Sequence, residues 1–153
     1  MVSVNSRCIG ATTVLIVDDD EMVVDYLSHI VAAAGYKVVT ATNAQTALVA
    51  LQADLVRVVI LDVMMPDTDG LELCRLIRRH TYSGYVYLIL HTAQLTEADI
   101  LAGLAAGADA YVIKGTSRAQ IIESLRTAQQ ILELAQAQPV SFPRRGILRP
   151  PAL

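Results

Sequence analysis

The sequence predicts an α/β protein in which helices cover both faces of a doubly wound, five-stranded parallel sheet. Short apolar runs alternate with segments of helical periodicity five times along the chain, which is the rhythm of repeated βαβ units. Hydrophobic residues make up 54% of the 153 residues and charged residues only 18%, a balance that suits strands buried on both faces. The length favours one domain with a sizeable core.

The expected strands are short apolar runs, and the expected helices fill the intervals between them. Gly35 should end the first helix because a glycine commonly follows the last helical residue, while Asn43 and Asp69 are good N-caps. The strands span residues 13–17, 36–40, 58–61, 86–90 and 110–113. The helices span about 22–34, 43–53, 69 to at least 77, 96–106, and from 116 or 117 onward.

The last expected helix carries apolar residues at alternating steps of four and three, which leaves two interpretations open. It either packs on the sheet and overruns its edge, or forms a coiled-coil linker or dimer seam. Packing is favoured because a coiled coil normally needs ~3 or more heptads. Four of the chain's five prolines follow Gln138, so we expect a flexible tail. The domain should span 11–130, with an N-terminal extension over 1–10 and the helix extension and tail over 131–153.

Charge and cysteine content argue against several classes of partner. The formal net charge is −3, which gives no general attraction to nucleic acid or to an anionic membrane. No run reaches the ~18 apolar residues of a membrane span. Cys8 and Cys74 have no metal-binding spacing, which suits a reduced compartment. We therefore expect a cytoplasmic protein with no direct nucleic-acid or membrane partner.

Acidic residues follow two of the expected strands. The first strand runs into Asp18 and Asp19 in VLIVDDDEMV, and the third is followed by Asp62. Carboxyl ends of parallel strands share one edge of a sheet, so these three carboxylates should converge there. Because close carboxylates repel, a divalent cation with oxygen ligands is needed, and Mg²⁺ fits. The next residues, Asp20 and Glu21, more simply begin the first helix, whose dipole favours negative charge.

A hydroxyl and an ammonium group follow the remaining two strands of this edge. Thr92 ends the fourth strand in YLILHTA, and Lys114 follows the fifth in GADAYVIKG. Beside a metal-bound carboxylate they make sense if that carboxylate carries a phosphoryl group, which the hydroxyl hydrogen-bonds and the ammonium neutralises. Aspartate is a known covalent phosphoryl acceptor.

Over about residues 11–128 the sequence resembles the response-regulator receiver domain of two-component signalling. The resemblance rests on the residues above, on MPDTDG beyond Asp62, and on Tyr111 in GADAYVIK. It implies a (βα)5, flavodoxin-like fold with strand order 2-1-3-4-5. It also implies a switch rather than a turnover enzyme, in which Asp62 takes a phosphoryl group from a sensor histidine kinase or phosphotransfer protein.

The resemblance assigns a role to each site residue. Asp19 and Asp62 would ligate Mg²⁺ directly, Asp18 through water, and Met64 by its backbone carbonyl. Thr92 and Lys114 would hold the phosphoryl oxygens.

The same resemblance implies a conformational change. Thr92 would move toward the phosphoryl group, and Tyr111 would turn inward. The face made by the fourth helix, fifth strand and fifth helix would then bind a downstream protein or a fused output domain, or form a homodimer, for which the fifth-helix extension is another candidate.

Gly115 departs from the family pattern, which has a proline after the lysine, usually in a cis peptide bond. We expect a trans bond here, because a cis bond without proline costs ~3 to 4 kcal/mol. The departure supports an alternative function, a pseudo-receiver that binds partners without being phosphorylated. Two further alternatives are weaker. A haloacid-dehalogenase-like phosphatase would need small and hydroxyl residues after Asp20, and a flavin-binding protein would need hydroxyls and amides in place of acids.

The histidines and Met64 carry no strong signal of chemistry. We expect His29, His80 and His91 to be surface or strand-edge residues, since they show no metal-ligand spacing. The apolar Met64, two residues after the acceptor, suggests that the phosphoryl group is not removed by an assisting side chain.

Overall fold

A single parallel sheet organises the protein. The computed structural model describes residues 12–53, 55–65, 69–80, 84–93 and 96–137. Its five strands are ordered β2-β1-β3-β4-β5, as the sequence predicts. They are β1 (Thr13–Val17), β2 (Lys37–Ala41), β3 (Val56–Asp62), β4 (Tyr87–Thr92) and β5 (Ala110–Ile113). The helices are α2 (Glu21–Ala33), α3 (Ala44–Ala53), α4 (Gly70–Arg79), α5 (Glu97–Ala106) and α6 (Arg118–Ala137).

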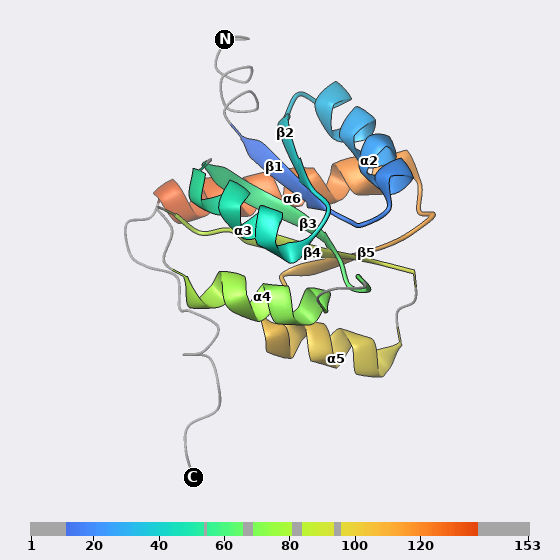
Figure 1. The fold of residues 1–153 in the computed structure, drawn as a ribbon. Helices are drawn as coiled ribbons and strands as arrows, with labels where there is room; N and C mark the ends of the chain where they lie inside the picture. Colours follow the sequence, from blue (N-terminus) through green and yellow to red (C-terminus); the bar gives the residue numbers. More distant parts are fainter. Residues whose placement is uncertain (1–11, 54, 66–68, 81–83, 94–95, 138–153) are drawn as a thin grey trace, which may run out of the picture.

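The helices form one layer on each face of the sheet (Figure 1). Helices α2 and α6 pack on one face, and α3, α4 and α5 pack on the other. Alternate strand residues enter the two cores, so that in β3 Val59 and Leu61 point to one side while Val58 and Ile60 point to the other. This alternation is the two-residue period of a strand.

Helix ends occur where the capping residues predict them. Asp20 caps α2 by accepting a hydrogen bond of 2.9 Å from the Met22 amide, and Asp69 caps α4. Thr96 opens α5 with a capping box. Gly35 has a φ of 101° just beyond α2, a conformation that is natural for glycine. The caps fix where each helix begins relative to the strand that precedes it.

Three strands differ from their predicted limits. Strand β2 begins one residue later, and β3 begins two residues earlier than predicted. Strands β3 and β4 also continue to Asp62 and Thr92, because the parallel ladder extends to the pairs Asp62↔His91 and Thr92↔Ile113. Two of the predicted site residues therefore belong to the sheet itself.

Helix α6 packs on the sheet along its apolar stripe. Ile121, Leu125, Ala128 and Leu132 are all buried in the core that it shares with α2, which confirms the packing interpretation for this stripe. The predicted flexible tail and N-terminal extension lie outside the described residues.

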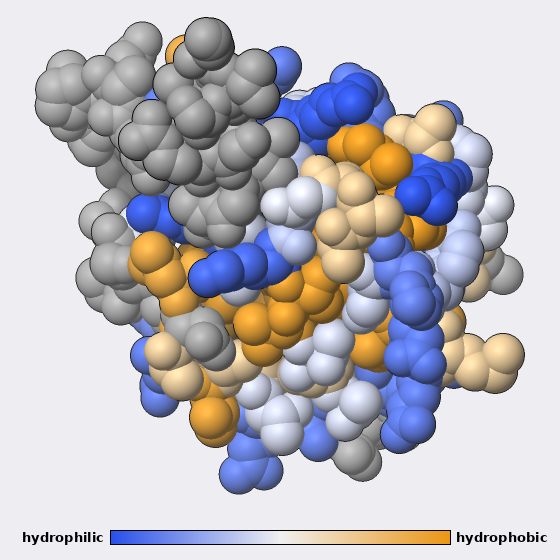
Figure 2. Space-filling model, turned by 90° about the horizontal axis from the view of Figure 1, so that it is seen from above, coloured by the Kyte–Doolittle hydropathy of each residue, from blue (hydrophilic) through white to orange (hydrophobic). Residues whose placement is uncertain are grey.

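The described surface mixes polar and apolar residues. On the face shown in Figure 2, hydrophobic residues occur in separate patches among hydrophilic ones, as is normal for protein surfaces. Within the described part of the chain, no helix is both long and apolar enough to cross a membrane.

Candidate functional site

Three carboxylates converge at the carboxyl edge of the sheet, as the sequence predicts. Asp18 and Asp19 follow β1, and Asp62 ends β3. One carboxylate oxygen from each lies within 4.8 Å of the other two. Asp18 is only 1% exposed and Asp62 only 4%, whereas Asp19 faces solvent. The cluster therefore has a buried floor and an open side.

Local hydrogen bonds orient the two buried carboxylates. Oδ1 of Asp18 accepts a bond of 2.9 Å from the Asp20 amide, and Oδ1 of Asp62 accepts one of 3.2 Å from the Met64 amide. Met64 itself is 80% exposed and belongs to neither hydrophobic core. These amide donors fix the carboxylates without neutralising them.

Lys114 brings the positive charge. Its Nζ atom lies 3.2 Å from Oδ1 of Asp62 and 3.3 Å from Oδ2 of Asp18. The Lys114 amide also donates a hydrogen bond of 2.7 Å to the Thr92 carbonyl. Gly115 has a φ of 88°, which glycine adopts without strain. None of the described peptide bonds is cis, so the bond before Gly115 is trans, as expected.

The electrostatics of the cluster favour an added cation. Burial, and then the neighbouring Asp18 charge, raise the pKa of Asp62 above its ordinary value despite the attraction of Lys114. Burial lowers the pKa of Lys114, but the charges of Asp62 and Asp18 outweigh it and leave the pKa raised. Asp18 and Asp62 thus share the one ammonium group of Lys114, and the negative charge of the cluster is not fully balanced.

The donor set suits Mg²⁺. All three clustered groups are carboxylates, the hard oxygen ligands that this cation takes. Oδ2 of Asp18 is buried, and the Lys114 ammonium that lies 3.3 Å from it is shared with Asp62. Buried charges are costly unless they are paired, and one ammonium cannot balance all three carboxylates. The residues present therefore fit a divalent cation.

A cavity of about 410 Å³ lies beside Asp62, and the remaining predicted site residues line it as well. Thr92, Tyr111 and Lys114 line it together with Asp62. Tyr111 lies against α5, where its hydroxyl donates to the carbonyl of Ile100. The structure therefore brings all the predicted phosphoryl-binding and switch side chains to one place. The predicted loop residues 66–68 lie outside the described part of the chain.

His91 corrects one expectation from the sequence. It is not a surface or edge residue, because β4 lies between β3 and β5 and the side chain is only 4% exposed. Burial, and then the Lys114 charge, lower its pKa to about 4. The imidazole is therefore neutral at pH 7. His29 and His80 are exposed, as expected.

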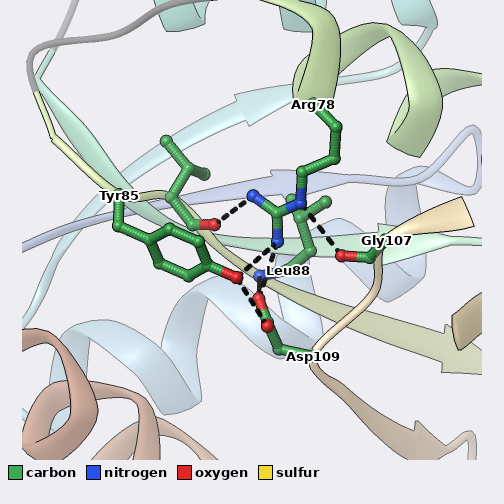
Figure 3. A network of polar contacts seen from close by, with 6 residues as sticks. Arg78, Tyr85, Leu88, Gly107 and Asp109 are labelled. Carbon is green, nitrogen blue, oxygen red and sulfur yellow. Dashed lines mark hydrogen bonds and ion pairs between the residues drawn. The ribbon is translucent and has the colours of Figure 1, made fainter. Parts of the chain in front are cut away.

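A polar network around the buried Asp109 carboxylate, at the opposite edge of the sheet, was not predicted (Figure 3). Arg78 of α4 donates to Asp109 at 2.7 Å and to the carbonyls of Val86 and Gly107 at 2.7 and 3.0 Å. Asp109 also accepts bonds from the Tyr85 hydroxyl and the Leu88 amide. The network fastens α4 to the start of β4 and to the turn between α5 and β5. Arg78 and Asp109 are 31 residues apart in sequence, so no local sequence pattern predicts their pairing.

The chain matches the family model of the response regulator receiver domain over residues 14–126. It is 34% identical to the transcriptional regulatory protein YvrH of Bacillus subtilis, covering 74% of this chain and 47% of that protein. It is 32% identical to the transcriptional regulatory protein GltR of Pseudomonas aeruginosa, covering 82% and 52%. The chain thus spans about half the length of these relatives.

Solved structures agree with this match. The chemotaxis protein CheY4 of Vibrio cholerae superimposes with a TM-score of 0.73 at 27% identity, over 76% of this chain and 98% of that one. A CheY-like receiver domain from Methanospirillum hungatei gives a TM-score of 0.74 at 26% identity, over 80% and 97%.

Proposed function

This chain belongs to the response regulator receiver domain family of two-component signalling, and we propose that it is a Mg²⁺-dependent switch that is phosphorylated on Asp62. Receiver domains act in phosphorelay signalling, so the class of function follows from the family. The acceptor, the metal ligands and the output face are the specific parts of the proposal.

One observation carries the proposal. A single ammonium, that of Lys114, lies within 3.3 Å of two carboxylates that end different strands, and a third carboxylate joins the cluster on its open side. A fold gains little from assembling three acids and one base at the edge of a sheet. The arrangement makes chemical sense around a ligand that carries both a cation and an anionic phosphoryl group.

The proposed metal ligands are the clustered acids. Asp19 and Asp62 would bind Mg²⁺ directly, Asp18 through water, and the backbone carbonyl of Met64 would complete the protein ligands. When bound, Mg²⁺ would neutralise charge on the acceptor carboxylate and on the incoming phosphoryl oxygens.

Asp62 is the proposed nucleophile because it combines burial with a position beside both the cluster and the cavity. One of its carboxylate oxygens forms a bond to phosphorus while the phosphorus–nitrogen bond of the donor phosphohistidine breaks, which leaves an acyl phosphate and a free histidine. Lys114 and Thr92, which line the same cavity, would hold the phosphoryl oxygens by charge and hydrogen bonding.

The proposed output is a shift of the face made by α5, β5 and α6. Thr92 and Tyr111 line the cavity beside the acceptor, so a phosphoryl group there could bias a two-state equilibrium of this face. We propose a sensor histidine kinase or phosphotransfer protein as donor, and a downstream protein or fused output domain as receiver of the signal. The relatives are transcriptional regulators of about twice the matched length, which supports a fused output. A homodimer through this face or through the end of α6 belongs to the same proposal.

The domain limits are also proposed. The family match over 14–126 supports a receiver domain over 11–130, with an N-terminal extension over 1–10 and the helix extension and tail over 131–153.

Phosphoramidate tests the function because it offers the same phosphorus–nitrogen bond as phosphohistidine. The purified chain is incubated with phosphoramidate and Mg²⁺, and ³¹P NMR follows the formation of an acyl phosphate. The proposal predicts a signal that is lost in Asp62→Ala and with EDTA. A folded wild-type chain that binds no Mg²⁺ and gives no signal would instead support the pseudo-receiver alternative, for which Gly115 is the main argument.

A further inference from the structure

We propose that Gly103 of α5 is a positioning residue for Tyr111, because its missing side chain leaves the space in which the tyrosine lies against the helix. The packing part of the inference rests on the contacts of Gly103 and Tyr111 in the structure. Its consequence for signalling rests on the proposed function.

Tyr111 reaches from β5 to α5 through its hydroxyl group. The hydroxyl donates to the carbonyl of Ile100 and lies 3.3 Å from the carbonyl of Asp99. Both carbonyls belong to the turn of α5 that precedes Gly103. The ring therefore lies across the face of the helix on which Gly103 stands.

The space beside Gly103 is filled by that ring. A Cβ atom at Gly103 would overlap the Tyr111 hydroxyl oxygen and would lie 2.8 Å from Cζ of Tyr111 and 2.8 Å from Cδ1 of Leu90. Real Cβ atoms essentially never approach other heavy atoms so closely. Any side chain at this position would therefore displace the tyrosine, the leucine or both.

Backbone conformation gives no competing reason for a glycine here. The described glycines with positive φ are Gly35, Gly107 and Gly115, so Gly103 has an ordinary helical backbone. Alanine is intrinsically better than glycine inside a helix, and α5 otherwise uses alanine freely in EADILAGLAA. The exception is explained by the space that the Tyr111 ring fills, with Leu90 beside it.

The position of Tyr111 bears directly on the candidate site. Tyr111 and Leu90 line the cavity of about 410 Å³ that also contains Asp62, Thr92 and Lys114. A side chain at position 103 would push the tyrosine away from α5 and change the wall of that cavity. Gly103 thereby determines how strongly a change at Asp62 affects the α5 and β5 parts of the proposed output face.

A thermal double-mutant cycle tests the packing in the unmodified protein. It compares Gly103→Ala, Tyr111→Ala and the double variant, with Ala105→Gly as a control because Ala105 is exposed on the same helix. The inference predicts that Gly103→Ala lowers the Tm even though alanine favours helix, and that the loss shrinks when Tyr111 is also truncated. If Gly103→Ala instead raises the Tm by about as much as Ala105→Gly lowers it, the inference is overturned.

NMR of ¹³C-labelled tyrosine rings tests the consequence for the switch. The Tyr111 signal is assigned with Tyr111→Phe and followed as Mg²⁺ and fluoroberyllate, a phosphoryl mimic, are added. In Gly103→Ala the signal should already be displaced before addition and should shift less on addition, although the mimic still binds. An unchanged Tyr111 signal in Gly103→Ala would contradict the inference.

The two experiments separate the inference from the proposed function. A wild-type chain that ignores fluoroberyllate would count against the function, and the thermal cycle would still decide whether Gly103 makes room for Tyr111.

Discussion

Lys114 follows β5 and Asp62 ends β3, yet Nζ of Lys114 lies 3.2 Å from Oδ1 of Asp62 across the intervening strand β4. The lysine side chain reaches over the carboxyl edge of the sheet to make this contact. It does so with glycine rather than proline at the following position. The ammonium therefore stands beside the carboxylate that would take the negatively charged phosphoryl group.

Replacing Lys114 should separate metal binding from phosphoryl transfer. In Lys114→Met we expect acyl phosphate formation to slow by ~10²-fold, the usual effect of losing one group that stabilises developing negative charge. Mg²⁺ binding should persist or strengthen, because the ammonium that competes for Asp62 and Asp18 is gone. The rate comes from mass spectrometry and the affinity from calorimetry.

The chain offers a matched control in Lys37→Met, since Lys37 is its other lysine and is exposed at the start of β2. The control should leave both quantities unchanged. Equal transfer rates in Lys114→Met and wild type would refute the role of the ammonium.

Removing the charge of Asp62 should stabilise the metal-free protein at neutral pH. The pKa of Asp62 is raised in the folded state, chiefly by burial and then by Asp18. Its contribution to stability is therefore fully present below the unfolded pKa and is lost as the pH rises through the folded pKa. Asp62→Asn should therefore raise the free energy of unfolding at pH 7, because the folded chain no longer buries this charge.

This gain should disappear as the pH falls through the pKa of Asp62 toward 3.8, the ordinary value for aspartate. Urea denaturation at several pH values measures it, with Asp25→Asn, an exposed carboxyl on α2, as the control. A pH-independent difference between Asp62→Asn and wild type would contradict the electrostatic explanation.

Asp19 and Asp20 should differ in their effect on Mg²⁺ affinity although they are adjacent. Asp19 belongs to the carboxylate cluster, whereas Asp20 caps α2. Asp19→Asn should weaken Mg²⁺ binding by at least roughly tenfold, which is about 1.4 kcal/mol of binding free energy. Asp20→Asn removes the same charge, keeps a good cap and should weaken binding much less. Calorimetric titration measures both, and equal losses would count against direct ligation by Asp19.

The Arg78 network should be a major source of stability and not of chemistry. The Asp109 side chain is only 6% exposed, so Arg78→Ala would leave a buried carboxylate without its cation and should cost roughly 3 kcal/mol. Chemical denaturation measures the loss. The neighbouring Arg79 is exposed, and Arg79→Ala should stay within about 0.5 kcal/mol of wild type. If Arg78→Ala lowers the free energy of unfolding by less than about 0.5 kcal/mol, the network does not stabilise the fold.

The sequence predicted the parts of this molecule that depend on local rules. Strand and helix positions follow from hydrophobic periodicity and caps such as Asp69 and Thr96. The convergence of Asp18 and Asp62 follows because parallel strands present their carboxyl ends at one edge. That one rule is enough to predict the acidic cluster.

The features that escaped prediction depend on tertiary contacts. The burial of His91 comes from a central strand covered on both faces, where no alternation of polar residues marks the inner side. The pairing of Arg78 with Asp109 and the packing of Tyr111 on Gly103 join segments that only the folded chain brings together. The observed strand limits differ from the predicted ones by one or two residues, because hydrogen-bonded pairing with the neighbouring strand, and not composition, decides where a strand ends.

Intact-mass spectrometry with acetyl phosphate tests the central claim most directly. Wild type and Asp62→Ala are incubated with acetyl phosphate, with and without Mg²⁺. The account predicts one phosphoryl adduct in wild type, only with Mg²⁺, and none in Asp62→Ala. An adduct of equal yield in Asp62→Ala, or a folded wild-type chain that remains unmodified with Mg²⁺, would contradict phosphorylation of Asp62.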